Sequence, residues 1–299
     1  PYDGSENADA ALDTLNLAGL PPDLEMFVAV TNVWLPLSPY DITRAVSARR
    51  MKVLTAGASS FVPALRDYEE QRVLSLEAEN RISAMFPLAN IKTEAMHDVA
   101  TVANEIVRKA KTWGAELIVI GSNPSPSPHI NDYAGPALRV AQDAQCSVRI
   151  ARATDRKGES RVRIVIGVQE ILSGAEVVQA VASRSWPAGS EAVIVMVESG
   201  PRDAAKASEV ALALEQMAET LRAMGLKASI PIRNGDAQEV LLQEAGAFSA
   251  DCIFINATAD SFDRLGLSKV AQVLILGAHC SVEVIRAKTL NDQDFKSAA

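Results

Sequence analysis

The chain has 299 residues, of which 48% are hydrophobic, and its formal net charge is -8 at pH 7. This length exceeds one ordinary compact domain, and the apolar content suffices for two hydrophobic cores. The acidic balance argues against a nucleic-acid partner or an anionic membrane surface, because both require clustered Lys and Arg.

Membrane and metal chemistry also lack support in the sequence. No stretch sustains the roughly 20 apolar residues of a membrane helix, and the opening PYDGSENADA has neither a basic head nor an apolar run. We therefore expect a cytoplasmic protein with no membrane partner. Cys146, Cys252 and Cys280 are too few and too scattered for a disulfide framework or a zinc site. We expect buried, reduced thiols and no metal.

The first half of the chain contains several predicted elements in order. An apolar strand ends at Val30 within LPPDLEMFVAV, and an acidic helix is expected around residues 67–79. Further strands are expected in GAELIVIG at 114–121 and in SVRIA within QCSVRIAR at 145–152. The polar run that begins TDRKGES marks a linker over residues 154–160.

The second half alternates strand and helix signals more regularly. Gly225 is a predicted helix stop, and Asp236-x-x-Glu239 resembles a capping box. In order, the prediction is a strand in RVRIVIGV, a helix over Glu176–Ser185, a strand in AVIVMV, a helix through residues 210–224, a strand in KASIPI, a helix from Asp236, a strand in CIFI, a helix and a strand in SVEVI. Apolar strands separated by amphipathic helices indicate a parallel sheet covered on both faces.

Landmarks in the two halves recur in the same order. Cys146 and Cys280 lie 134 positions apart, Gly121 and Asn256 lie 135 apart, and Pro21 and Pro187 lie 166 apart. The larger offset indicates an insertion of about one helix and loop in the first half, between Trp34 and Ile91. We predict two α/β domains, residues 1–153 and 161–299.

The repeat also predicts that the first domain lacks a strand. At the offset of 166, Asp3 aligns with Gln169, so the RVRIVI strand of the second half has no counterpart. A sheet without its central strand would have two unpaired edges. We therefore expect an apolar strand upstream of Pro1 that this sequence lacks.

Several motifs resemble the universal stress protein family in its tandem two-domain form: YDGS at 2–5, GAELIVIGS at 114–122, and the paired phrases DAQCSVRIAR and GAHCSVEVIR. The resemblance implies two doubly wound, Rossmann-like parallel sheets with strand order 3-2-1-4-5. It also implies that the two CSV strands meet in an intramolecular pseudo-dimer. Such edge strands invite partners, so separated halves should self-associate, and the whole chain could form a homodimer.

In ATP-binding members of this family, an Asp after the first strand holds the adenosine, and a G-x2-G-x9-G-[ST] loop holds the phosphates. By this resemblance the nucleotide-site candidates are Asp3, Gly4, Gly121, Ser122 and Gly135. Pro124 and Ala134 replace two loop glycines, and Pro124, Pro126 and Pro128 provide no N–H donors.

The second half departs further from the family's pattern. Gln169, Asn256 and Ala259 replace the matching Asp and glycines, and Gly266 is out of register. Asp260 and Asp263 would repel a triphosphate. We predict that this half does not bind nucleotide.

Three functions remain. The first is a stress-response or regulatory scaffold, not an enzyme, that works by contact with an unidentified protein and needs no cofactor. The second is a sensor of ATP, AMP or adenosine that uses only the first half. The third is slow ATP hydrolysis in the same pocket. His279 adjoins Cys280 on a strand, where neighbours point to opposite faces, and His97 and His129 lack partners at metal-ligand spacing. We therefore expect no catalytic residues, and at most weak adenine-nucleotide binding.

Overall fold

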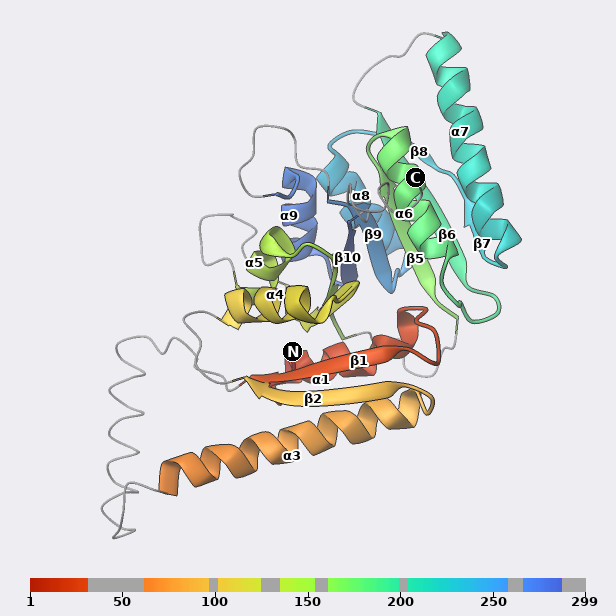
Figure 1. The fold of residues 1–299 in the computed structure, drawn as a ribbon. Coiled ribbons are helices and arrows are strands. Elements are labelled where there is room, and N and C mark those ends of the chain that lie inside the picture. Colours follow the sequence, from red (N-terminus) through yellow and green to blue (C-terminus); the bar gives the residue numbers. More distant parts are fainter. Residues whose placement is uncertain are drawn as a thin grey trace, which may run out of the picture.

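The computed structural model describes residues 1–31, 62–96, 102–124, 135–153, 161–198, 204–257 and 266–286. They form a mixed α/β fold with mostly parallel strands and helices on both sides of the main sheet (Figure 1). This is the predicted fold class. Within these ranges, no helix combines the length and the apolar character needed to span a bilayer.

The first half contains these elements: α1 (Glu6–Asp13), the 3-10 turn η1 (Leu15–Leu17), β1 (Glu25–Thr31), α3 (Val62–Met85), β2 (Asn90–Met96), α4 (Val102–Trp113), β3 (Leu117–Gly121), α5 (Pro136–Asp143) and β4 (Ser147–Ala151). Local chemistry sets several of the starts. Ser5 caps α1 by accepting a hydrogen bond from the Ala8 N–H at 3.2 Å. Pro136 begins α5, where its missing N–H has no cost.

The second half contains β5 (Arg163–Val168), α6 (Ile171–Ala182), β6 (Glu191–Glu198), α7 (Ala204–Ala223), β7 (Lys227–Ser229), β8 (Ile232–Asn234), α8 (Ala237–Phe248), β9 (Cys252–Asn256), α9 (Lys269–Gly277) and β10 (Ser281–Ile285). Both β7 and β8 pair with β6, so the spatial order is β7/β8, β6, β5, β9, β10. This is the predicted 3-2-1-4-5 order, with β5 at the centre.

Two predicted element boundaries in the second half need correction. The predicted KASIPI strand is divided into β7 and β8, because Pro231 lies between them and has no N–H for the sheet. The helix predicted over 176–185 instead runs from Ile171 to Ala182. Two other signals are confirmed. Gly225 has a φ of +87° just beyond α7, and Asp236 caps α8 by accepting hydrogen bonds from the N–H groups of residues 238 and 239.

The two halves share one sheet. β4 and β10 pair antiparallel, with Arg149 opposite Glu283, and this pairing completes an eight-stranded sheet. The expected meeting of the two CSV strands is thus observed. A hydrophobic core on one face includes buried residues of both halves, such as Leu138 of α5 and Leu274 of α9. The core on the other face lies mainly within the second half, between the sheet and α6 and α7.

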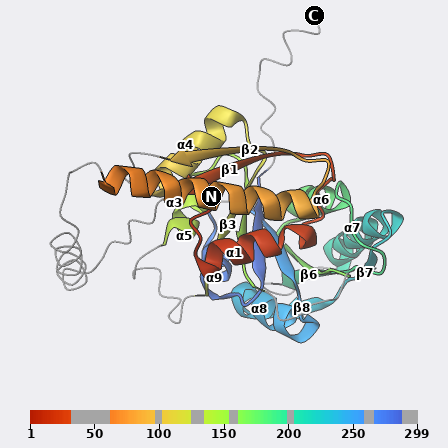
Figure 2. The ribbon, with the colours of Figure 1, turned by 90° about the horizontal axis from the view of Figure 1, so that it is seen from below.

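The remaining strands of the first half stand apart from the main sheet. β1 and β2 pair parallel as a two-stranded sheet, and α3 lies along them (Figure 2). Among the described residues, no strand pairs with both β1 and β3. On the side of β1 away from β2, Tyr2 forms an isolated parallel bridge with Val30. A smaller core beneath α1 and α3 holds this layer in place.

The cysteines differ partly from the prediction. Cys252 is buried as expected, but Cys146 and Cys280 are only partly buried, because both lie just before the strands they introduce. Burial raises the pKa of all three thiols, that of Cys280 to about 11. All three are therefore protonated at neutral pH.

Candidate functional site

The Asp3 carboxylate, predicted to hold a nucleoside, takes part in the turn that starts α1. Its Oδ1 accepts a hydrogen bond from the Ser5 N–H at 2.9 Å. Gly4, between them, has a φ of +71°, a conformation that favours glycine. A Cβ on Gly4 would also lie 2.6 Å from the Leu74 side chain of α3. Asp3 and Gly4 therefore have a structural role, whatever else they bind.

Gly121 and Ser122 lie at the end of β3, under the first turn of α1. A Cβ on Gly121 would be 1.8 Å from the carbonyl oxygen of Asn7, so only glycine fits against the helix here. The Ser122 N–H donates to the carbonyl of Ala151 at 3.1 Å. Gly135 caps α5, and a Cβ added there would meet no other atom within 4 Å. Close packing thus explains why position 121 holds glycine, but it does not explain the glycine at position 135.

In the second half, the strand end beneath α6 holds an asparagine where the strand end beneath α1 holds Gly121. Asn256 lies where Gly121 lies in the first half, and Ser173 corresponds to Asn7 at the offset of 166. The Asn256 side-chain amide donates to the carbonyl of Ser173 at 3.5 Å and to the Glu176 carboxylate at 2.8 Å. In the first half the Asn7 backbone of α1 fills this position, whereas in the second half the Asn256 side chain lies there and bonds to α6.

The structure does not gather the five predicted residues around either of two cavities in its described part. A cavity of about 580 Å³ lies between β1 and β3, and one of about 770 Å³ lies between the two halves, but neither lining includes Asp3, Gly4, Gly121, Ser122 or Gly135. Within the part of the chain that the structure describes, no cluster of His, Cys, Asp or Glu could hold a metal. His97, Pro126, Pro128, His129, Ala134, Ala259, Asp260 and Asp263 lie outside the described residues.

Replacing Gly121 with alanine tests the close contact with α1. Gly121→Ala should destabilise the chain by about 1 to 3 kcal/mol, because the Asn7 backbone must move. Gly246→Ala is the matched control: Gly246 lies within α8 with no atom near its Cβ position, so alanine should stabilise by about 0.5 to 1 kcal/mol. Urea unfolding of both variants measures this difference in sign. Two changes of the same sign would show that the contact is not rigid.

A more elaborate arrangement lies where β4 meets β10, which we call the junction: Ser147–Arg152 and Ser281–Arg286. Its hydrogen bonds are reciprocal between the halves. The Arg152 N–H donates to Ser281 Oγ at 3.2 Å, and the Arg286 N–H donates to Ser147 Oγ at 3.1 Å. Each serine and each arginine corresponds to the other at the offset of 134. The repeated Cys-Ser-Val phrase therefore encodes a pairing motif.

The arginine side chains continue this symmetry. Arg286 donates to the carbonyl of Ala141 at the end of α5, at 2.8 Å. Arg152 donates to the carbonyl of Ile275 in α9, the residue 134 positions after Ala141. Each half thus extends an arginine to the helix before the other half's last strand.

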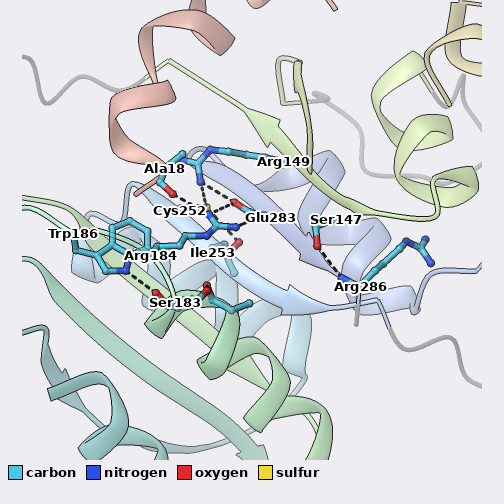
Figure 3. A network of polar contacts seen from close by, with 12 residues as sticks. Ala18, Ser147, Arg149, Ser183, Arg184, Trp186, Cys252, Ile253, Glu283 and Arg286 are labelled. Carbon is cyan, nitrogen blue, oxygen red and sulfur yellow. Dashed lines mark hydrogen bonds and ion pairs between the residues drawn. The ribbon is translucent and has the colours of Figure 1, made fainter. Parts of the chain in front are cut away.

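At the centre of the junction the symmetry is broken by charge. Arg149 and Glu283 are equivalent positions that face each other, and their side chains form an ion pair at 3.2 Å, 1% and 0% exposed respectively. The Arg149 guanidinium also donates to Cys252 Sγ at 3.2 Å (Figure 3). Arg184, after α6, forms a second ion pair with Glu283 and donates to the carbonyl of Ala18 at 2.9 Å.

The charges of this cluster compensate one another, as they do in an ion pair that holds a fold together. Burial acts to lower the pKa of Arg149, but the Glu283 carboxylate, through its charge and a hydrogen bond, raises it. One buried carboxylate therefore pairs with two arginines, and Arg149 remains charged. Arg149 Nε and Nη2 have no hydrogen-bond partner among the described residues. Beside the cluster, the Trp186 ring packs edge-to-face against the Phe254 ring, with 6.2 Å between the ring centroids.

Our sequence reasoning did not identify Arg149, Arg184 or Glu283 as important, although a signal was present. SVRIA and SVEVI differ in charge at one equivalent position, Arg149 in the first and Glu283 in the second. An opposite charge at equivalent positions of a repeat is compatible with direct pairing across a two-fold axis. Arg184 gave no comparable signal, because it follows a helix far away in the sequence.

Comparison with known proteins supports the family resemblance. Residues 153–286 match the model of the universal stress protein family. No curated protein sequence matches the chain.

Two solved structures match the chain over different shares of its length. A universal stress protein from Archaeoglobus fulgidus DSM 4304 is 18% identical, with 96% of this chain and 94% of that chain covered and a TM-score of 0.60. A universal stress protein from Lactobacillus plantarum is 18% identical, with 43% of this chain and 100% of that chain covered and a TM-score of 0.34. The Archaeoglobus structure shows that the fold is shared over nearly the whole chain.

Proposed function

Because residues 153–286 form a domain of the universal stress protein family, we propose that the chain acts in the stress response as a non-enzymatic scaffold that works by protein contact. The observation that carries this proposal is the junction. There β4 and β10 pair antiparallel around a buried ion pair, which supports two α/β units, residues 1–153 and 161–299, paired as an intramolecular pseudo-dimer. An arrangement built for a fixed pairing suits a protein that presents surfaces to a partner.

The described residues of the first half also support weakened phosphate binding. A phosphate cradle needs several N–H groups that converge on one point. The Ser122 N–H is already bonded to Ala151, and Pro124 has none. One oxygen of the Asp3 carboxylate is occupied by the Ser5 N–H, which leaves the other for a weak contact with a nucleoside.

Calorimetry with ATP and magnesium tests this proposal. If two charge-assisted hydrogen bonds of roughly 1.5 to 3 kcal/mol each are missing, the affinity should fall by about two to four powers of ten from that of an intact site. We therefore expect no submicromolar ATP binding. Submicromolar affinity would instead favour the sensor function.

Asp3→Ala separates a surviving nucleoside contact from general destabilisation. If AMP or adenosine binds weakly through Asp3, this variant should abolish the binding heat. Asp236→Ala is the matched control, because the Asp236 carboxylate also accepts backbone N–H groups at a helix start but lies in the other half. Each variant should cost about 1 kcal/mol of stability. An equal loss of binding in both would contradict a contact through Asp3.

A further inference from the structure

The larger of the two cavities lies between the two halves of the chain. Its volume is about 770 Å³, which is within the size range of small-molecule sites. One wall comes from the first half: the end of α4, the start of β3 and the residues that lead into β4. The facing wall comes from the end of α6 and the end of β10. Small-molecule sites often lie at such interfaces between two folded units.

Most of the lining is apolar, but its charged groups are mainly positive. The apolar side chains include Leu20, Val107, Ala110, Leu117, Ala180 and Ile285. The cations that line the cavity are Lys111, Arg184 and Arg286, and the single acidic residue in its described lining is Glu116. Because the whole chain has a net charge of -8, this excess of cations is a local feature. An apolar space with cations in its wall is complementary to a ligand with an apolar body and an acidic head group.

Arg286 is only partly compensated for the water that it loses in this wall. Its Nη2 donates to the carbonyl of Ala141 at 2.8 Å and to that of Gln142 at 3.3 Å. Its Nε is buried and has no hydrogen-bond partner among the described residues. Burial lowers the pKa of Arg286, although Asp143 acts to raise it. An anion beside this guanidinium would therefore be favourable.

The equivalent positions of the repeat do not share all of these charges. At the offset of 135, Lys111 corresponds to Gly246, and at the offset of 166, Arg184 corresponds to Ala18. Two of the three cations thus occur only on the side of the chain where the cavity lies. Arg184 already pairs with Glu283, so Lys111 and Arg286 are the cations available to a ligand.

We propose that the cavity between the halves binds a small amphipathic anion, whose carboxylate lies beside Lys111 and Arg286 and whose hydrocarbon chain lies against the apolar walls. Such a ligand contacts both halves at once, so its binding also stabilises their pairing. The site is separate from the five nucleotide-site candidates, because none of them lines this cavity.

The Cys146 thiol provides a direct test, because it lines the cavity and is partly buried. Laurate, at about ten times its dissociation constant, should slow the alkylation of Cys146 by iodoacetamide about tenfold, since only the unoccupied fraction reacts. Cys280 is also partly buried but lies outside this lining, so its alkylation rate should not change. Dodecanol has the same hydrocarbon chain without the charge, and acetate has the charge without the chain. Each should protect Cys146 much less than laurate does.

Two results of this experiment would overturn the proposal. One is equal protection of Cys146 by laurate and by dodecanol, because the cations would then have no part in binding. The other is the absence of protection at every laurate concentration below that at which micelles form.

Charge reversal at Lys111 tests the ionic contact separately. Lys111→Glu should weaken laurate binding at least about tenfold and leave dodecanol binding unchanged, because it places a like charge beside the carboxylate. Lys269→Glu is the matched control, since it makes the same charge change at an exposed position of α9 outside the lining. Calorimetry measures the binding, and urea unfolding checks that each variant is folded. If both variants weaken laurate binding equally, net charge and not the cavity governs it, and the proposal fails.

Discussion

Glu283→Ala should destabilise the folded chain by about 3 to 5 kcal/mol, one of the two largest effects that we expect from this structure. The substitution leaves Arg149 buried without its carboxylate and deprives Arg184 of the same partner. The cost arises from uncompensated charge more than from lost packing. Denaturant unfolding, with the slope compared between variants, measures it.

An exposed ion pair of the same residue types is the control. Glu244 pairs with Arg233, but the Arg233 side chain is 45% exposed, so Glu244→Ala should cost at most about 1 kcal/mol. Glu283→Gln, which keeps the shape and removes the charge, should lie between the two alanine variants. If Glu283→Ala costs no more than Glu244→Ala, water reaches the junction and its charges are not desolvated.

Much of the fold could be predicted from the sequence, because apolar runs and short phrases recur along it in a regular order. The apolar runs around Val165, Ile194 and Ile253 lack the alternation expected of strands with one solvent-exposed face. Continuous apolar strands indicate a parallel sheet covered on both sides. The repeated Cys-Ser-Val phrase predicted which strands meet. The offset of 166 also aligned Tyr2 with Val168, and the Tyr2 bridge to Val30 matches the pairing of Val168 with Met196.

The candidate site was predicted less well, because it depends on distances that no local pattern encodes. Gly121 was read as a nucleotide-loop glycine, whereas in the structure it also gives α1 room to approach β3. The role of Arg184 arises only when α6 packs beside β10.

Separating the halves should leave a 1:1 complex, and the central charges are the reason. If two first halves paired in the same register, Arg149 would face Arg149, and two second halves would place Glu283 opposite Glu283. In a pair of second halves, Arg184 would reduce the repulsion between the two Glu283 carboxylates. In a pair of first halves, no carboxylate would lie between the two Arg149 side chains. The self-association expected from free edges alone should therefore lose to the mixed pairing, because like charges facing each other in an interface cost several kcal/mol.

The experiment is to cut the chain at a protease site placed within residues 154–160 and to measure the association of the two pieces by sedimentation. The unaltered pieces should stay together, whereas Arg149→Glu should weaken their association at least about 100-fold, which corresponds to about 2.8 kcal/mol. Arg139→Glu makes the same charge change at an exposed position of α5 and should have no effect. If the pieces sort into like pairs, or if both variants behave alike, then backbone pairing alone, and not the buried charge pair, decides which edges of this protein meet.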